Sequence, residues 1–215
     1  DTAASELDAV KAGDAILLAV KPGDIECLAK KIGGHVKNKL VISILAGVST
    51  SILEKLLPGA RVVRVMPNIN VAVEAAISAV CGGKLASEED INFTKKLFSA
   101  VGEVVVVEEA LMDAITALSG CGPAFIAMII DGLSLAGVRM GLPKKLALRI
   151  TCKVVAGTAE HVKLLESTEK LVEKVSTPAG ATIEGVQLLE SKGIRGILME
   201  AVWNSYVKSS KLLRR

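Results

Sequence analysis

The sequence has few aromatic residues and no long block of one charge. Phe, Trp and Tyr make up 2% of its 215 residues, and 26 basic against 23 acidic residues leave a formal net charge of +3. Stacking on single-stranded nucleic acid needs more aromatic side chains than this. The basic tail that ends at Arg215 suits the negative end of a helix dipole better than a nucleic-acid patch. We therefore expect no nucleic-acid partner.

Long uncharged apolar runs are also missing, since none reaches the roughly 18 residues that a membrane span needs. The longest candidate, residues 114–130, is interrupted by Gly120, Gly122 and Pro123. Apolar residues nevertheless form 51% of the chain, and the mean hydropathy is +0.49. We therefore expect no membrane partner, and the apolar excess must lie in a core or in a subunit interface.

The four cysteines and two histidines show no spacing typical of a metal site or of nucleophilic catalysis. Cys27, Cys81, Cys121 and Cys152 lie far apart, and no CxxC pair occurs. This predicts no metal ligands, and unpaired cysteines suit a reducing, cytoplasmic compartment. No signal peptide is visible. A GxGxxG phosphate-binding motif is missing as well.

Residues 1–107 alternate short β-branched runs with helical segments. Buried strands are predicted at 15–20, 40–45, 61–66, 76–81 and 104–107. Helices are predicted at 25–32, 49–57 and 87–100. Serine and threonine residues cap the second of these helices, and acidic residues open the third. This alternation indicates an α/β fold, a parallel sheet of Rossmann type.

Residues 108–215 lose the strand signal and carry 3.6-residue apolar spacing. Helices are predicted at 110–118, 123–140, 143–165 and 192–213, and several are apolar around most of their circumference. Such helices must be buried on every side. We expect an all-α domain that dimerises by intertwining; a self-contained bundle with one apolar groove is the alternative.

Three segments stand where ligands bind in such folds. Ala19, Val20, Lys21 and Pro22 follow the first strand, at the edge where the loops of an open sheet receive ligands. An ordinary β–α turn is the alternative for these residues. Ala46 follows the second strand, where small side chains let a flat cofactor approach the backbone. Asn68, which follows the third predicted strand, could bind a cofactor or cap a turn.

The third segment is residues 175–183, VSTPAGATI. Thr177 is a natural N-cap and Pro178 a natural first helical residue, and small residues follow. Free N–H groups at such a helix start attract a carboxylate, and the hydroxyls of Thr177 and Thr182 add donors. The alternative is an ordinary capped helix start.

Taken together, these segments resemble pyrroline-5-carboxylate reductase. The matching strings are AVKP at 19–22, ISILAGV at 42–48, RVVRVMPN at 61–68, FSAVG at 98–102, DAITALSGCGPAF at 113–125, GLP at 141–143 and VSTPAGATI at 175–183. They run over essentially the whole chain, and the last is specific to the family.

The resemblance implies a truncated Rossmann domain at 1–107 and a helical dimerisation and substrate-binding domain at 108–215. It implies a homodimer or a ring of dimers that reduces the C=N bond of 1-pyrroline-5-carboxylate to L-proline with NADPH or NADH, the last step of proline synthesis. The implied cofactor residues are Ala19, Val20, Lys21, Pro22 and Ala46. The implied substrate residues are Thr177, Gly180, Ala181, Thr182, Glu109 and Lys174, with Thr182 also orienting the ring nitrogen during catalysis.

The chain departs from the family pattern in two respects. The family carries an N-terminal portion with GxGxxG, so roughly 50 residues of a mononucleotide-binding half are expected before Asp1. Cys121 stands where serine is common in the family, Asn70 where proline is common, and Ala179 where glycine is common. We expect the methyl group of Ala179 to crowd the carboxylate pocket.

Two other functions stay open. One is a non-catalytic dimerisation module without the cofactor-binding half. The other is a hydroxy-acid reductase of the same architecture, which needs a lysine on an interdomain helix, whereas Lys144 and Lys145 lie at a helix start.

Overall fold

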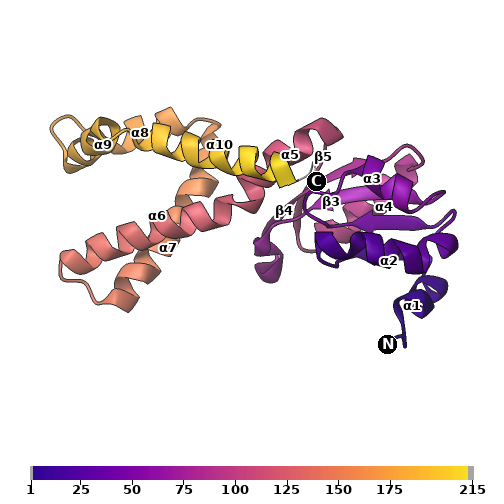
Figure 1. The fold of residues 1–215 in the computed structure, drawn as a ribbon. Helices are drawn as coiled ribbons and strands as arrows, with labels where there is room; N and C mark the ends of the chain where they lie inside the picture. The colour runs from indigo at the N-terminus through magenta and orange to yellow at the C-terminus, as the bar shows by residue number, and fades with distance from the viewer. Residues whose placement is uncertain (1, 213–215) are drawn as a thin grey trace. The chain divides into compact units, whose positions relative to one another are not determined.

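A computed structural model describes residues 2–212 of the chain (Figure 1). It forms two compact units, residues 1–122 with 202–215 and residues 123–201. The strands of the first unit are β1 (Ala15–Leu18), β2 (Leu40–Ser43), β3 (Arg61–Met66), β4 (Ala76–Gly82) and β5 (Gly102–Val106). Its helices are α1 (Glu6–Ala12), α2 (Ile25–Ile32), α3 (Thr50–Leu56), α4 (Glu88–Ser99) and α5 (Met112–Ile115), with the 3₁₀ turns η1 (Pro22–Asp24), η2 (Gly33–His35), η3 (Ile69–Val73) and η4 (Glu109–Leu111).

The five strands form one sheet in the order β1-β2-β3-β4-β5. β1, β2 and β3 are parallel, as predicted, but β4 runs antiparallel to β3, and β5 is parallel to β4. The predicted α/β class is confirmed, but the sheet is mixed, and the prediction that all its strands are parallel is wrong. Only residues 67–75 join β3 to β4, and a parallel crossover needs about a dozen residues or more.

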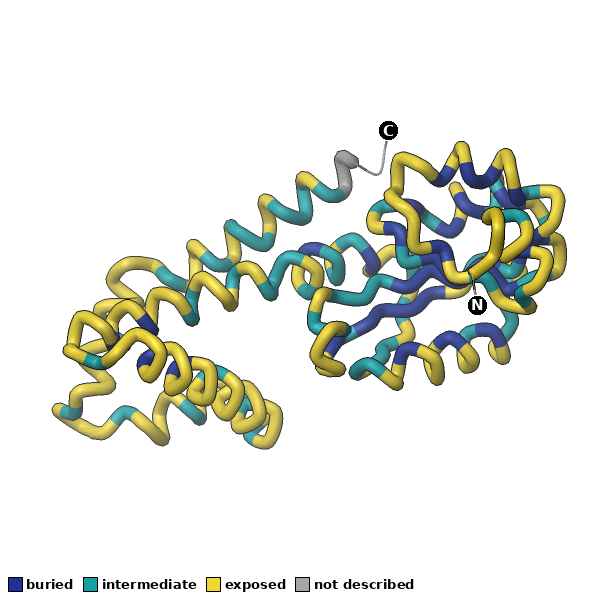
Figure 2. Tube along the Cα trace, turned by 90° about the horizontal axis from the view of Figure 1, so that it is seen from below, coloured by how far each residue is buried: buried dark blue, intermediate teal, exposed yellow. Residues whose placement is uncertain are grey.

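Helices cover both faces of the sheet. Side chains of α1, α2 and α3 pack on one face around Ile32 and Leu53, which are 1% and 0% exposed. α4 packs on the other face, with Phe98 against Val63 and Val65. α5 places Met112 against Ala79 and Cys81 of β4. These layers give the first unit three clusters of buried apolar residues, and the buried parts of the chain are dark in Figure 2.

Local signals explain most helix starts in this unit. Ser49 accepts a hydrogen bond from the N–H of Ile52 at the start of α3, and Ser87 and Asp90 form a reciprocal capping box at the start of α4. The prediction that the first strand is buried on both faces is wrong, since Leu17 is 50% exposed. The reason is that α4, on that face, packs over β3, β4 and β5.

The second unit contains helices that expose many apolar side chains. They are α6 (Gly122–Arg139), α7 (Lys144–Leu165), α8 (Thr168–Val175), α9 (Ala181–Ser191) and the start of α10 (Ile194–Leu212). Among its hydrophobic residues, all of which the structure describes, Ala147 alone is buried (Figure 2). Gly137 makes the contact between α6 and α7 possible, because a Cβ there would lie 3.0 Å from Cβ of Ala147.

A continuous helical stretch runs from Glu109 to Arg139. The predicted interruption at Gly120–Pro123 does not occur, because the chain passes from α5 through a π-helix at Thr116–Gly120 into α6. By length and composition this stretch is long and apolar enough to cross a membrane, with 11% of its most apolar window buried. An apolar helix that meets a partner subunit has the same composition.

Candidate active site

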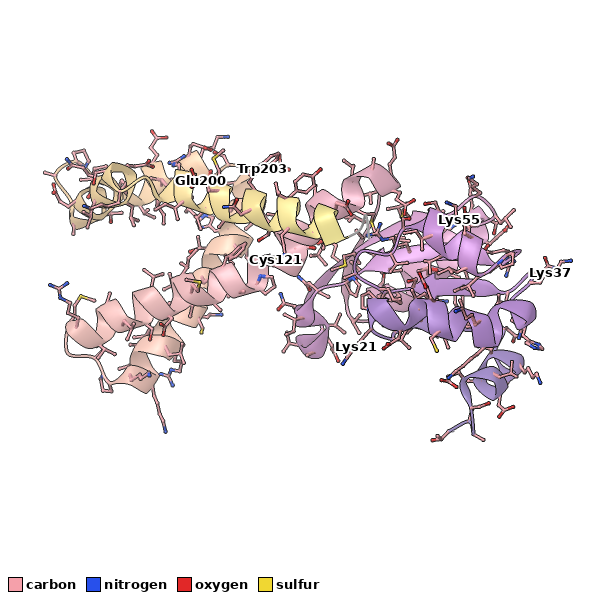
Figure 3. All side chains as sticks on the ribbon, viewed as in Figure 1. Lys21, Lys37, Lys55, Cys121, Glu200 and Trp203 are labelled. Carbon is pink, nitrogen blue, oxygen red and sulfur yellow. The ribbon has the colours of Figure 1, made fainter. Side chains whose placement is uncertain are left out.

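The loops after β1, β2 and β3 meet at one edge of the sheet, because these adjacent strands are parallel. Lys21, which follows β1, lies at this edge, and Lys37, which precedes β2, lies at the opposite one (Figure 3). The structure therefore brings together the predicted cofactor residues Ala19, Val20, Lys21, Pro22 and Ala46. The carboxyl edge of parallel strands is where open α/β sheets hold nucleotides.

Two features of this edge bear on ligand binding. Ala46 is exposed, and Gly47 next to it has φ +82°, a conformation that suits glycine in a tight turn. Asn68, two residues after the end of β3, has a buried side-chain oxygen that forms no hydrogen bond within the described residues. A buried acceptor without a partner is costly, so a ligand that donates a hydrogen bond would be favoured here.

The predicted carboxylate site lies at the start of α9, but the helix begins later than expected. Gly180 is the N-cap and Ala181 the first helical residue, so Thr177 is not the cap and Pro178 is not the first residue. Instead, residues 177–180 form a turn closed by a hydrogen bond from the N–H of Gly180 to the carbonyl oxygen of Thr177. Ala179 has φ +58° and cannot continue a right-handed helix.

The turn leaves the amino end of α9 open. No side chain caps the helix, so the first-turn N–H groups of this 11-residue helix are available to an anion. Thr177 and Thr182 are both exposed. A Cβ at Gly180 would lie 2.3 Å from the hydroxyl oxygen of Thr177, so the absence of a side chain at 180 lets this hydroxyl lie beside the helix start.

Glu109 has partners that the sequence does not reveal. Its carboxylate accepts hydrogen bonds from the backbone N–H and the hydroxyl of Thr50, and lies 3.4 Å from Nη1 of Arg64. Arg64 is 3% exposed, and its Nη2 lies 3.7 Å from Oδ1 of Asp113. A substrate contact for Glu109 stays a prediction, and these partners show that its carboxylate is already engaged.

Lys174, in the last turn of α8, is exposed. Its backbone precedes the turn at 177–180, and no described contact fixes its ammonium group. A role for Lys174 in substrate binding therefore stays a prediction.

The π-helix is a feature that sequence reasoning missed. Gly120 ends it, and a Cβ at this position would lie 3.2 Å from Cε of Met66, the last residue of β3. Glycine thus lets the π-helix approach the end of β3. Cys121 follows directly, where the π-helix meets α6 (Figure 3). Single π turns often occur at functional sites, but no sequence pattern marks this one in advance.

A groove of about 560 Å³ lies between α7 and α8 in the second unit. Half of its lining residues are valine or leucine, including Val154, Val162 and Leu171, and His161 and Lys153 also contribute. It has the character of an apolar packing surface. Within residues 2–212, no group of three His, Cys, Asp or Glu side chains is placed to hold a metal ion.

Comparison with protein families finds two matches. Residues 109–212 match the family described as pyrroline-5-carboxylate reductase dimerisation. Residues 1–47 match the family described as NADP oxidoreductase, coenzyme F420-dependent. The second match covers α1, β1, α2 and β2, the part with the predicted cofactor residues.

Curated relatives match nearly the whole chain. A pyrroline-5-carboxylate reductase of Synechocystis sp. is 40% identical over 206 residues, which are 95% of this chain and 77% of the relative. One of Methanosarcina acetivorans is 42% identical over 94% of this chain and 76% of the relative. The crystal structure of Plasmodium falciparum pyrroline carboxylate reductase with NADP bound superposes with a TM-score of 0.91 and 29% identity, covering 98% of this chain and 81% of that one.

Proposed function

The chain belongs to the pyrroline-5-carboxylate reductase family, and we infer that it is an oxidoreductase that reduces 1-pyrroline-5-carboxylate to L-proline with NAD(P)H. The reaction consumes one proton, because the ring nitrogen gains a hydrogen while the imine carbon receives the hydride. The two ligands have different sites, a dinucleotide edge in the first unit and an anion-binding helix start in the second.

NADPH or NADH, when bound, supplies the hydride. Ala19, Val20, Lys21 and Pro22 after β1, together with Ala46 after β2, would hold it. The fit is supported by the exposure of these residues and by the unpartnered oxygen of Asn68. A protonated imine is already electrophilic, so the protein mainly has to position its two ligands.

The observation that carries the substrate assignment is the open amino end of α9. The N–H groups of the first turn, including those of Ala181 and Thr182, would bind the substrate carboxylate, and the hydroxyl of Thr177 would add a donor. Gly180 keeps that hydroxyl beside the helix start. We place the hydroxyl of Thr182 at the ring nitrogen, where it orients the imine.

We also propose that the protein is a cytoplasmic homodimer or a ring of dimers. The dimerisation match at 109–212 and the exposed apolar helices of the second unit support self-association. The cysteines are unpaired, as expected in a reducing compartment. Nothing in the chain favours the non-catalytic module, and conversion of 1-pyrroline-5-carboxylate together with saturable NADPH binding would exclude it.

The decisive experiment follows the oxidation of NADPH by absorbance with 1-pyrroline-5-carboxylate as substrate. We expect turnover by the wild type, and a Thr182→Ala variant with kcat/KM lowered roughly tenfold to a hundredfold, the range for losing a hydrogen bond to a charged group. Ser191→Ala, at the other end of α9, is the matched control and should stay at the wild-type value. An inactive wild type refutes the reductase, whereas an unchanged Thr182→Ala removes only Thr182 from the mechanism.

A further inference from the structure

Glu109 caps a helix that lies far from it in the sequence. Thr50 is the first residue of α3, and its backbone N–H donates to Oε1 of Glu109 at 2.6 Å. The hydroxyl of Thr50 donates to the other carboxylate oxygen. Ser49 satisfies the N–H of Ile52 in the same turn. The start of α3 is thus fixed both by its own cap and by a carboxylate that follows β5.

Arg64 holds that carboxylate in place. It lies in β3, is almost fully buried, and has Glu109 and Asp113 as its carboxylate partners. A buried guanidinium without partners is strongly unfavourable, so two acidic side chains from the segment after β5 are held at β3. Replacing Glu109 leaves this buried guanidinium with Asp113 as its remaining carboxylate partner.

The capped helix follows a loop of the dinucleotide edge. Residues 44–49 connect β2 to α3 and include the exposed Ala46. At the start of this loop, Ser43 is the register partner of Arg64. At its end, Thr50 is bound to Glu109. Arg64 therefore lies beside the strand position that precedes the loop, and its partner Glu109 binds the residue that follows the loop.

We propose that Glu109 and Arg64 are positioning residues that hold the 44–49 loop in the shape that receives the nicotinamide dinucleotide. The inference rests on the proposed function, because it takes this edge of the sheet as the cofactor site. It replaces the substrate contact predicted for Glu109 with an action through Thr50 on cofactor affinity.

The test uses Glu109→Gln, which keeps the size of the side chain but removes its charge and one acceptor oxygen. NADPH binding is titrated by fluorescence without substrate, and we expect Kd to rise about tenfold, the loss expected for a charge-assisted hydrogen bond. KM for NADPH should rise in parallel, while KM for 1-pyrroline-5-carboxylate stays within about twofold. Glu108→Gln, at the exposed neighbouring residue, is the control and should bind as the wild type does.

A second readout needs no cofactor. Hydrogen exchange of the Thr50 amide should be faster in Glu109→Gln than in the wild type, together with exchange in the 44–49 loop. If Glu109→Gln fails to fold, Thr50→Val retains the backbone donor, loses the hydroxyl, and should raise the Kd for NADPH about twofold to threefold.

The outcomes separate the two hypotheses. Unchanged NADPH affinity in a folded Glu109→Gln variant, or in Thr50→Val where that is the variant that folds, overturns the positioning role. Raised KM for 1-pyrroline-5-carboxylate with unchanged NADPH affinity would instead restore the predicted substrate contact. A wild type that neither binds NADPH nor turns over refutes the proposed function itself.

Discussion

The two compact units bury their apolar residues in opposite ways. In the first unit, Leu53, Val62 and Val63 are fully buried between the sheet and its helices. In the second, Met128 and Met140 are 75% and 77% exposed. A unit that leaves most of its apolar side chains exposed needs a partner surface, since each large side chain contributes about 1.5–3 kcal/mol when buried. We therefore expect the first unit to be stabilised by its own core and the second by association.

The largest effect should come from a charge on the exposed apolar surface of the second unit. Met128 lies on α6 within the dimerisation match. We expect Met128→Glu to convert the oligomer largely to monomer, because a buried, unpaired carboxylate at an interface costs several kcal/mol. Light scattering after size exclusion measures the change in mass.

Leu97→Glu makes the same kind of change on α4 of the first unit, where Leu97 is 46% exposed. This control should keep the mass of the wild type. Equal dissociation by both variants, or by neither, would remove the distinction between the two units.

The second prediction compares one substitution in both units. Leu53→Ala removes a fully buried side chain and should lower the free energy of unfolding by about 2–5 kcal/mol. Leu164→Ala, on the surface of α7, should change it by less than about 0.5 kcal/mol. Urea unfolding measures both at one protein concentration. A large effect of Leu164→Ala would place that residue in the association surface.

The third prediction uses the cysteines as probes of burial. Burial, with a smaller contribution from the carboxylate of Glu109, raises the pKa of the Cys81 thiol to about 11 against the opposing effect of Arg64. At pH 8, alkylation by iodoacetamide should therefore be at least about a hundredfold slower at Cys81 than at the exposed Cys27. Peptide mass spectrometry measures both rates, and equal rates would show that the first unit opens readily.

The raised pKa of the Cys81 thiol also makes the free energy of unfolding depend on pH. Above 9.0 the unfolded thiol of Cys81 ionises while the folded thiol stays protonated until about 11. The contribution of this group is therefore fully present below pH 9.0 and is lost as the pH rises towards 11. Cys81→Ala should flatten the decline in the free energy of unfolding over that interval.

The sequence predicts the first unit well where local signals act. The third strand and the serine-capped starts of α3 and α4 are found almost to the residue, because apolar runs and cap residues are local. The direction of β4 depends on the length of the connection before it, a constraint that an apolar run does not contain. The charge pair of Arg64 and Glu109 joins positions 45 residues apart, and no pattern in the sequence brings them together.

The sequence predicts the cofactor residues of the candidate site better than it predicts the start of α9. Residues that follow parallel strands gather at one edge by topology, so the cofactor residues follow from the strand assignment. The sequence predicts the start of α9 three residues too early, because Thr177-Pro178 has the composition of a helix start. In the structure, Pro178 and Ala179 lie in a turn instead. An alanine side chain gives no reason to predict the positive φ that Ala179 adopts there.

The smallest effect concerns that turn. Ala179 has φ +58°, a conformation that costs a residue with a Cβ about 1 kcal/mol and glycine much less. We expect Ala179→Gly to raise the free energy of unfolding by up to about 1 kcal/mol, the relief of strain exceeding the entropy that glycine adds to the unfolded chain. Ala156→Gly, inside α7, is the opposite control and should lower it by about 1 kcal/mol. KM for 1-pyrroline-5-carboxylate, measured on the Ala179→Gly variant, separates backbone strain from the predicted crowding by the methyl group, since only crowding lowers KM when the methyl group is removed.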